Sequence, residues 1–109
     1  MDKLTKQEIL AMSRVAHAMT ETAYQQHSAV RGDPAWVDKQ RILLADMALH
    51  LLQTALHDGV LSQDHLKRNL YAILNIADQF VEGHELKVVA DGLYGVGTVV
   101  QPANEKAVA

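Results

Sequence analysis

The chain has 109 residues, of which 49% are hydrophobic and 21% charged. This composition is that of an ordinary folded globule rather than of a disordered chain. The formal net charge is −3 and cysteine is absent. The acidic balance argues against a protein that depends on nucleic-acid phosphates. The lack of cysteine excludes disulfide frameworks, thiolate metal sites and cysteine nucleophiles.

The sequence carries no sign of export or of a membrane segment. The first residues have charges of both signs with no apolar run behind them, which is not the pattern of a secretory signal. The most apolar stretch, residues 42–56, is interrupted by Asp46, His50 and Gln53 and is too short to span a bilayer. We therefore expect a cytoplasmic protein that does not bind membranes.

A first helix is predicted from Lys6 to Gln26. Thr5 and Glu8 have the spacing of a capping box, in which each side chain bonds the backbone N–H of the other residue. Apolar residues then recur every three or four positions and predict one face packed on a neighbour: Ile9, Met12, Ala16, Met19 and Ala23. His17 falls on the opposite, outer face, where Glu21 is its expected partner.

A second helix is predicted to follow Asp33 as the N-cap, with Pro34 in its first turn, and to end at Asp58 before Gly59. Its apolar residues cover an arc of roughly 200°, twice the ~100° that a surface helix needs. We therefore expect this helix to be covered on most sides and shared between subunits of a homo-oligomer. The alternative is a monomer in which the fourth segment of the chain covers the exposed side of this helix. The predicted interface residues are Trp36, Leu44, Leu51 and Leu52.

The rest of the chain predicts a third helix with Ser62 as its N-cap, running through Glu82 to Gly83. For residues 85–100 two alternatives stay open. One is a helix from Glu85 to about Gly92 followed by an extended segment, which we favour because glycine inside a helix costs about 0.8–1 kcal/mol. The other is a longer, glycine-tolerant helix packed closely on a neighbour.

Together these elements predict an all-α fold: an antiparallel bundle of three main helices plus a short Gly-rich C-terminal helical segment, oligomeric. Residues 1–100 are expected to form a single helical domain, with residues 101–109 as a flexible tail.

The histidines do not predict a metal site. Asp46, His50 and His57 share one helix face, but a rise of about 1.5 Å per residue separates the two histidines by about 10 Å. We therefore interpret this strip as a solvated polar face or as hydrogen-bonded polar groups at an interface. No histidine has a serine or cysteine partner at a local spacing that indicates nucleophilic catalysis. The sequence thus predicts no catalytic residue, metal or cofactor.

These observations favour a non-enzymatic protein that binds another protein, as an adaptor, inhibitor or other regulator, and acts as a homo-oligomer. The alternative is a module with a site between subunits for a nucleotide-like ligand or a metal, with four candidate binding residues: His50, His57, Arg68 and Tyr71. A DNA-binding regulator is the weakest hypothesis, because the basic residues of the third helix are balanced by acidic ones.

Overall fold

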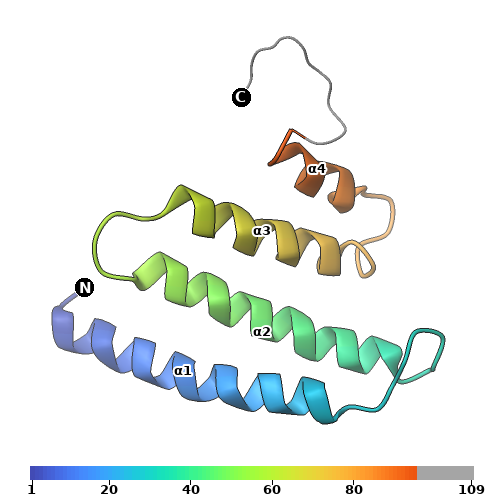
Figure 1. Cartoon of the computed structure of the whole chain (residues 1–109), viewed down its shortest axis with the longest axis horizontal. Coiled ribbons are helices and arrows are strands. Elements are labelled where there is room, and N and C mark those ends of the chain that lie inside the picture. The colour runs from blue at the N-terminus through green and yellow to red at the C-terminus, as the bar shows by residue number, and fades with distance from the viewer. Residues whose placement is uncertain (96–109) are drawn as a thin grey trace. The chain divides into compact units, whose positions relative to one another are not determined.

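A computed structural model describes residues 1–95 and shows four helices (Figure 1). These are α1 (Lys3–Gln26), α2 (Trp36–Leu56), α3 (Gln63–Ala77) and α4 (Leu86–Gly92). Helices make up 71% of this described part, which contains no strand, so the predicted all-α class is confirmed. No helix within residues 1–95 has the length and apolarity needed to cross a membrane.

The chain divides into two compact units, residues 1–69 and the residues from Leu70 onward, with the boundary inside α3. The three-helix bundle, the single domain over residues 1–100 and the oligomer therefore stay predictions. The segment from residue 96, including the predicted extended stretch and the tail at 101–109, lies outside the described residues.

Within the first unit, α1 and α2 form an antiparallel pair (Figure 1). At one end of the pair Lys6 lies 3.1 Å from Asp58, and at the other His27 lies 3.1 Å from Asp38. Lys6 thus pairs with Asp58, whereas His27, later in the chain, pairs with the earlier Asp38. The two helices therefore run in opposite directions. The nine residues between them, 27–35, give α2 the length of chain it needs to turn back along α1.

The face that α1 turns toward α2 is more polar than predicted. Ser13 is buried, and His17 and Thr20 are half-buried, whereas Met12 and Met19 are 64% and 67% exposed. Met12, Met19 and the exposed Ala23 therefore do not pack on α2, although Ile9 and Ala16 are half-buried as expected. The physical reason lies on α2, whose buried Asp46 faces α1, because a buried carboxylate must receive hydrogen bonds.

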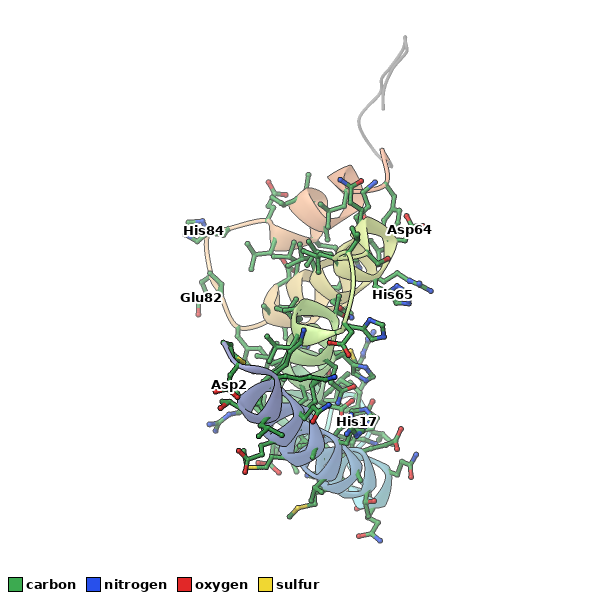
Figure 2. All side chains as sticks on the ribbon, turned by 90° about the vertical axis from the view of Figure 1, so that its left-hand side faces the viewer. Asp2, His17, Asp64, His65, Glu82 and His84 are labelled. Carbon is green, nitrogen blue, oxygen red and sulfur yellow. The ribbon has the colours of Figure 1, made fainter. Side chains whose placement is uncertain are left out.

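The amino end of α1 is capped by Asp2 rather than by Thr5 (Figure 2). The Asp2 carboxylate accepts hydrogen bonds from the backbone N–H and the hydroxyl of Thr5, both at 2.9 Å. These bonds hold the pKa of Asp2 below its ordinary value, the backbone bond contributing most. The prediction placed the cap three residues too late because Asp2 and Thr5 are both good capping residues. The predicted end at Gln26 is confirmed.

The start of α2 also differs from the prediction. Asp33 does not cap the helix: its carboxylate accepts from the backbone N–H of Val30 at 2.9 Å and thereby closes a turn in the loop. Helix α2 begins instead at Trp36, after Ala35. It ends at Leu56, two residues before the predicted end, and Gly59 follows with the positive φ of +90° that favours glycine.

Ser62 caps α3 as predicted, accepting from the backbone N–H of His65 at 3.2 Å. The helix ends at Ala77, five residues before Glu82, so Glu82 and His84 lie in the loop before α4 (Figure 2). The early end has a local cause, because the Asp78 carboxylate accepts from the backbone N–H of Lys87 at 3.2 Å in the first turn of α4. Helix α4 itself, Leu86–Gly92, matches the favoured alternative of a short helix ending at Gly92.

Candidate metal and ligand site

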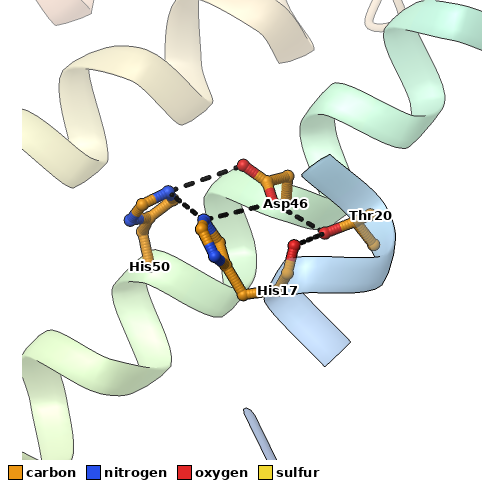
Figure 3. A network of polar contacts seen from close by, with 4 residues as sticks. All are labelled: His17, Thr20, Asp46 and His50. Atoms are coloured by element: carbon orange, nitrogen blue, oxygen red, sulfur yellow. Dashed lines mark hydrogen bonds and ion pairs between the residues drawn. The ribbon is translucent and has the colours of Figure 1, made fainter. Parts of the chain in front are cut away.

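Four polar side chains meet between α1 and α2 (Figure 3). His17 and Thr20 come from α1, one turn apart, and Asp46 and His50 come from α2 at i and i+4. The Nε2 atoms of the two histidines are 2.9 Å apart. The Asp46 carboxylate lies 3.4 Å from His17 Nε2 through Oδ1 and 3.5 Å from His50 Nε2 through Oδ2. We call His17, Asp46 and His50 the histidine–aspartate cluster.

The three side chains of the cluster differ in how far they are buried. The Asp46 side chain is 8% exposed, that of His17 is 22% exposed and that of His50 is 40% exposed. Thr20 donates its hydroxyl proton to Asp46 Oδ1 at 2.6 Å, and Thr20 Oγ1 also lies 3.1 Å from the backbone carbonyl oxygen of His17. The carboxylate is therefore held in place by Thr20, while both imidazoles present one ring nitrogen to it.

This arrangement corrects two sequence predictions. His17 does not lie on an outer face beside Glu21, because it packs edge-to-face on His50 with ring centroids 4.4 Å apart. Asp46 is not part of a solvated strip. The ring nitrogens of His17 and His50 and a carboxylate oxygen of Asp46 all lie within 4.8 Å of one another, close enough to hold one metal ion.

The sequence indicated only part of this cluster. The i, i+4 spacing of Asp46 and His50 was visible, as was the i, i+3 spacing of His17 and Thr20, but nothing local joins the two pairs. Helix α1 has both a polar and an apolar stripe, and the sequence prediction turned the apolar one toward its neighbour.

Beside the cluster is a cavity of about 420 Å³, which lies at the carboxyl end of α2 and the start of α3. Its lining contains three histidines together with other polar residues: His50, Gln53, Thr54, His57, Asp58, Val60, Ser62, His65 and Asn69. Two of the predicted binding residues, His50 and His57, therefore share one cavity. It is built within a single chain, whereas the prediction placed the site between subunits.

Two features give this cavity polar character. Asp58 carries a pKa below its ordinary value, chiefly because Lys6 donates a hydrogen bond to it and also attracts its charge. Asn69 Oδ1 is the buried side-chain oxygen that lacks a hydrogen-bond partner among the described residues. An unsatisfied buried acceptor costs free energy, so this wall of the cavity is suited to a ligand that donates a hydrogen bond.

The cavity also contains a serine–histidine contact that the sequence analysis did not identify. Ser62 Oγ lies 2.9 Å from His65 Nδ1, while it also accepts from the His65 backbone N–H. The sequence pattern Ser-x-x-His at the start of a helix could have indicated this contact between Ser62 and His65. Because the hydroxyl serves as the cap of α3, we read this contact as part of the helix end.

The other predicted residues lie apart from these groups. Arg68 is exposed on α3. Tyr71 belongs to the second unit, where its hydroxyl lies 3.4 Å from the Asp91 carboxylate and its ring packs edge-to-face on Tyr94 at 5.4 Å. The predicted interface residues of α2 are all half-buried, and their role between subunits stays a prediction: Trp36, Leu44, Leu51 and Leu52.

Comparisons with protein-family models, with curated proteins and with solved structures each give no significant match to this chain. The functional argument therefore depends on the residues described above.

Proposed function

We propose that this protein is a non-enzymatic helical interaction protein that associates with copies of itself, as a small adaptor, inhibitor or other regulator. The observation that carries the proposal is an apolar face on α1 that the first unit, residues 1–69, leaves exposed. Leu4 is 73% exposed, Met12 64%, Val15 62% and Met19 67%. At 100° per residue these four side chains fall within an arc of about 80°. We call them the α1 apolar face.

The α1 apolar face lies on the far side of the helix from α2. Helical periodicity places its centre about 160° from the line of Ser13, His17 and Tyr24, which turns toward α2. Covering it with another protein would therefore leave the contacts between α1 and α2 intact. The exposed Glu8 interrupts this face between Leu4 and Met12. An exposed apolar helix face of this kind is typical of a protein-binding surface.

A second copy of the chain is the occupant that the burial pattern favours. The buried hydrophobic residues in the described part are Ala29 and Ala90, and none of its large side chains is fully buried. Leu44, Leu51 and Leu52 of α2 are only half-covered. A domain of this size needs most of its apolar side chains out of water to offset its conformational entropy. A copy of the same chain meets that need in every molecule, whereas an occasional partner does not.

The test is the molar mass in solution, measured by analytical ultracentrifugation on the full chain. We expect a dimer or larger at micromolar concentration, with a melting temperature that rises with protein concentration. Val15→Glu places a charge on the α1 apolar face and should lower the mass to that of a monomer. Val88→Glu is the matched control, because Val88 is a helical valine with 61% exposure on α4. It should behave as the wild type.

Two results would overturn the proposal. One is a wild-type chain that is a strict monomer and keeps a concentration-independent melting temperature. The other is a Val15→Glu variant whose mass equals that of Val88→Glu and of the wild type.

A second candidate function, small-ligand binding, is favoured by the cavity beside the cluster. Its volume of about 420 Å³ is within the range of small-molecule sites, and Asn69 Oδ1 supplies an unsatisfied acceptor there. A thermal-shift screen with nucleotides tests it, because a ligand at 100 times its Kd adds about 2.7 kcal/mol to the free energy of unfolding. A shift that persists in Asn69→Ala would contradict this use of the cavity.

A further inference from the structure

We propose that the histidine–aspartate cluster is a binding site for one divalent transition-metal ion, with His17 Nε2, His50 Nε2 and an Asp46 carboxylate oxygen as ligands. Two imidazoles and one carboxylate are a donor set of zinc and of non-haem iron(II) sites. Magnesium and calcium prefer oxygen ligands throughout, so this donor set disfavours them.

The separations of the donor atoms support this assignment. Ligand atoms bonded to one zinc ion at about 2.0–2.1 Å in tetrahedral geometry are about 3.3–3.4 Å apart. In the cluster His17 Nε2 lies 3.4 Å from Asp46 Oδ1, His50 Nε2 lies 3.5 Å from Asp46 Oδ2, and the two nitrogens are 2.9 Å apart. One ligand atom from each residue lies within 4.8 Å of the other two. An ion would thus need to spread the two ring nitrogens by about 0.4 Å and to turn the carboxylate so that one oxygen faces both of them.

The charges and the burial also favour an ion at this position. The Asp46 carboxylate is almost fully buried, and the polar partners recorded for it are Thr20 and the two histidines. Neutral imidazoles leave its negative charge without a counter-charge, and a buried charge is costly unless it is paired or bound to a metal. A divalent cation between the three groups supplies that charge while both imidazoles stay neutral.

In such a site Thr20 is the hydrogen-bond donor that orients the metal-binding carboxylate. Metal-binding carboxylates are commonly held by further hydrogen bonds that fix their orientation, and Thr20 Oγ1 bonds Asp46 Oδ1 at 2.6 Å. The three ligands come from two helices that pack side by side, so their positions depend on a folded α1–α2 pair. Three protein ligands leave a coordination position for water, and His50 also lines the neighbouring cavity.

The experiment uses the full, untagged chain after removal of metal by a chelator. Cobalt(II) serves as the probe, because its visible absorbance reports a site with nitrogen ligands, and zinc(II) is added in competition. We expect saturation at one ion per chain, displacement of cobalt by an equivalent of zinc, and no displacement by excess magnesium. Zinc should raise the melting temperature, and the chelator should reverse the rise.

Variants separate this site from the other histidines. His17→Ala and His50→Ala should weaken cobalt binding by more than about 100-fold, and Thr20→Val by about 10-fold or more. His57→Ala is the matched control, because His57 lines the same cavity as His50 but lies outside the cluster. It should bind as the wild type. Asp46→Asn keeps an oxygen that can accept from the Thr20 hydroxyl and removes the negative charge. It therefore tests the carboxylate as a metal ligand in a chain that retains this hydrogen bond.

The proposal is overturned if folded wild-type protein shows no saturable cobalt signal and no zinc-dependent melting shift, since the cluster is then a hydrogen-bonded network only. It is equally overturned if His17→Ala and His50→Ala bind as tightly as His57→Ala. Neither result depends on the self-association proposed above, which is measured by mass.

Discussion

The Nε2 atoms of His17 and His50 lie 2.9 Å apart although 33 positions separate the two residues in the sequence. Each ring points to the carboxylate of Asp46, which α2 carries into the contact with α1 (Figure 3). A polar contact thus lies where two packed helices ordinarily place aliphatic side chains.

Thr20→Val removes the hydroxyl that donates to Asp46 at 2.6 Å and keeps a side chain of similar shape. We expect the free energy of unfolding to fall by about 1–3 kcal/mol, because a buried acceptor loses its donor. Thr22→Val is the control, since Thr22 is exposed on the same helix. Urea denaturation of metal-free protein measures both, and equal losses in the two variants would show that the bond to Asp46 contributes nothing.

Lys6→Gln should raise the pKa of Asp58 toward its ordinary value, because the hydrogen bond and the charge of Lys6 are the main causes of its lowering. Lys3→Gln should have a smaller effect, since Lys3 acts on Asp58 only through its charge. The carboxyl carbon resonance of Asp58, followed by NMR against pH, gives the pKa of Asp58 in each of the two variants. An unchanged value in Lys6→Gln would contradict the ion pair.

The same pair has a defined pH dependence. Because the folded-state pKa of Asp58 is lower than its unfolded value, the charged carboxylate adds stability above the unfolded pKa of about 4. That contribution is lost as the pH falls through the folded pKa. Stability measured from pH 7 down to pH 2 should therefore decline less steeply in Lys6→Gln than in the wild type.

Asp2→Ala should loosen the first turn of α1, because the backbone N–H of Thr5 loses its acceptor. Hydrogen exchange at the Thr5 amide should become faster, while Asp2→Asn, which keeps a side-chain oxygen, should stay close to the wild type. Were Thr5 the cap, as its spacing to Glu8 suggested, Asp2→Ala would leave this exchange rate unchanged.

Gly59→Ala and Gly92→Ala should have opposite effects. An added Cβ meets no atom within 4 Å at either position, but Gly59 has a φ of +90° and Gly92 is helical. We expect Gly59→Ala to destabilise by about 1–2 kcal/mol and Gly92→Ala to stabilise by about 0.5–1 kcal/mol. Chemical denaturation followed by circular dichroism measures both, and a stabilising Gly59→Ala would contradict the left-handed turn after α2.

Much of the secondary structure followed from local sequence. The end of α1 at Gln26, the cap at Ser62, the turn at Gly59 and the short helix ending at Gly92 were all predicted within a few residues. The cap at Ser62 and the turn at Gly59 depend on a capping side chain or a glycine next to the helix it limits, so neighbouring residues contain the required information. The errors arose where Asp2 rather than Thr5 caps α1, where Asp33 accepts from Val30 in the loop, and where Asp78 accepts from Lys87 in the first turn of α4.

The candidate site required the tertiary structure. His50 and His57 were selected from the sequence, but His17 was placed on the wrong face, and Ser62 was not connected to His65. The rotation of α1 about its axis decides whether His17 meets Asp46 or water, and helical periodicity gives only the relative angles of residues on one helix. Two stripes on α1 fit a neighbour, one polar and one apolar. The sequence determined that both stripes exist, whereas the choice between them depended on the buried carboxylate that the facing helix presents.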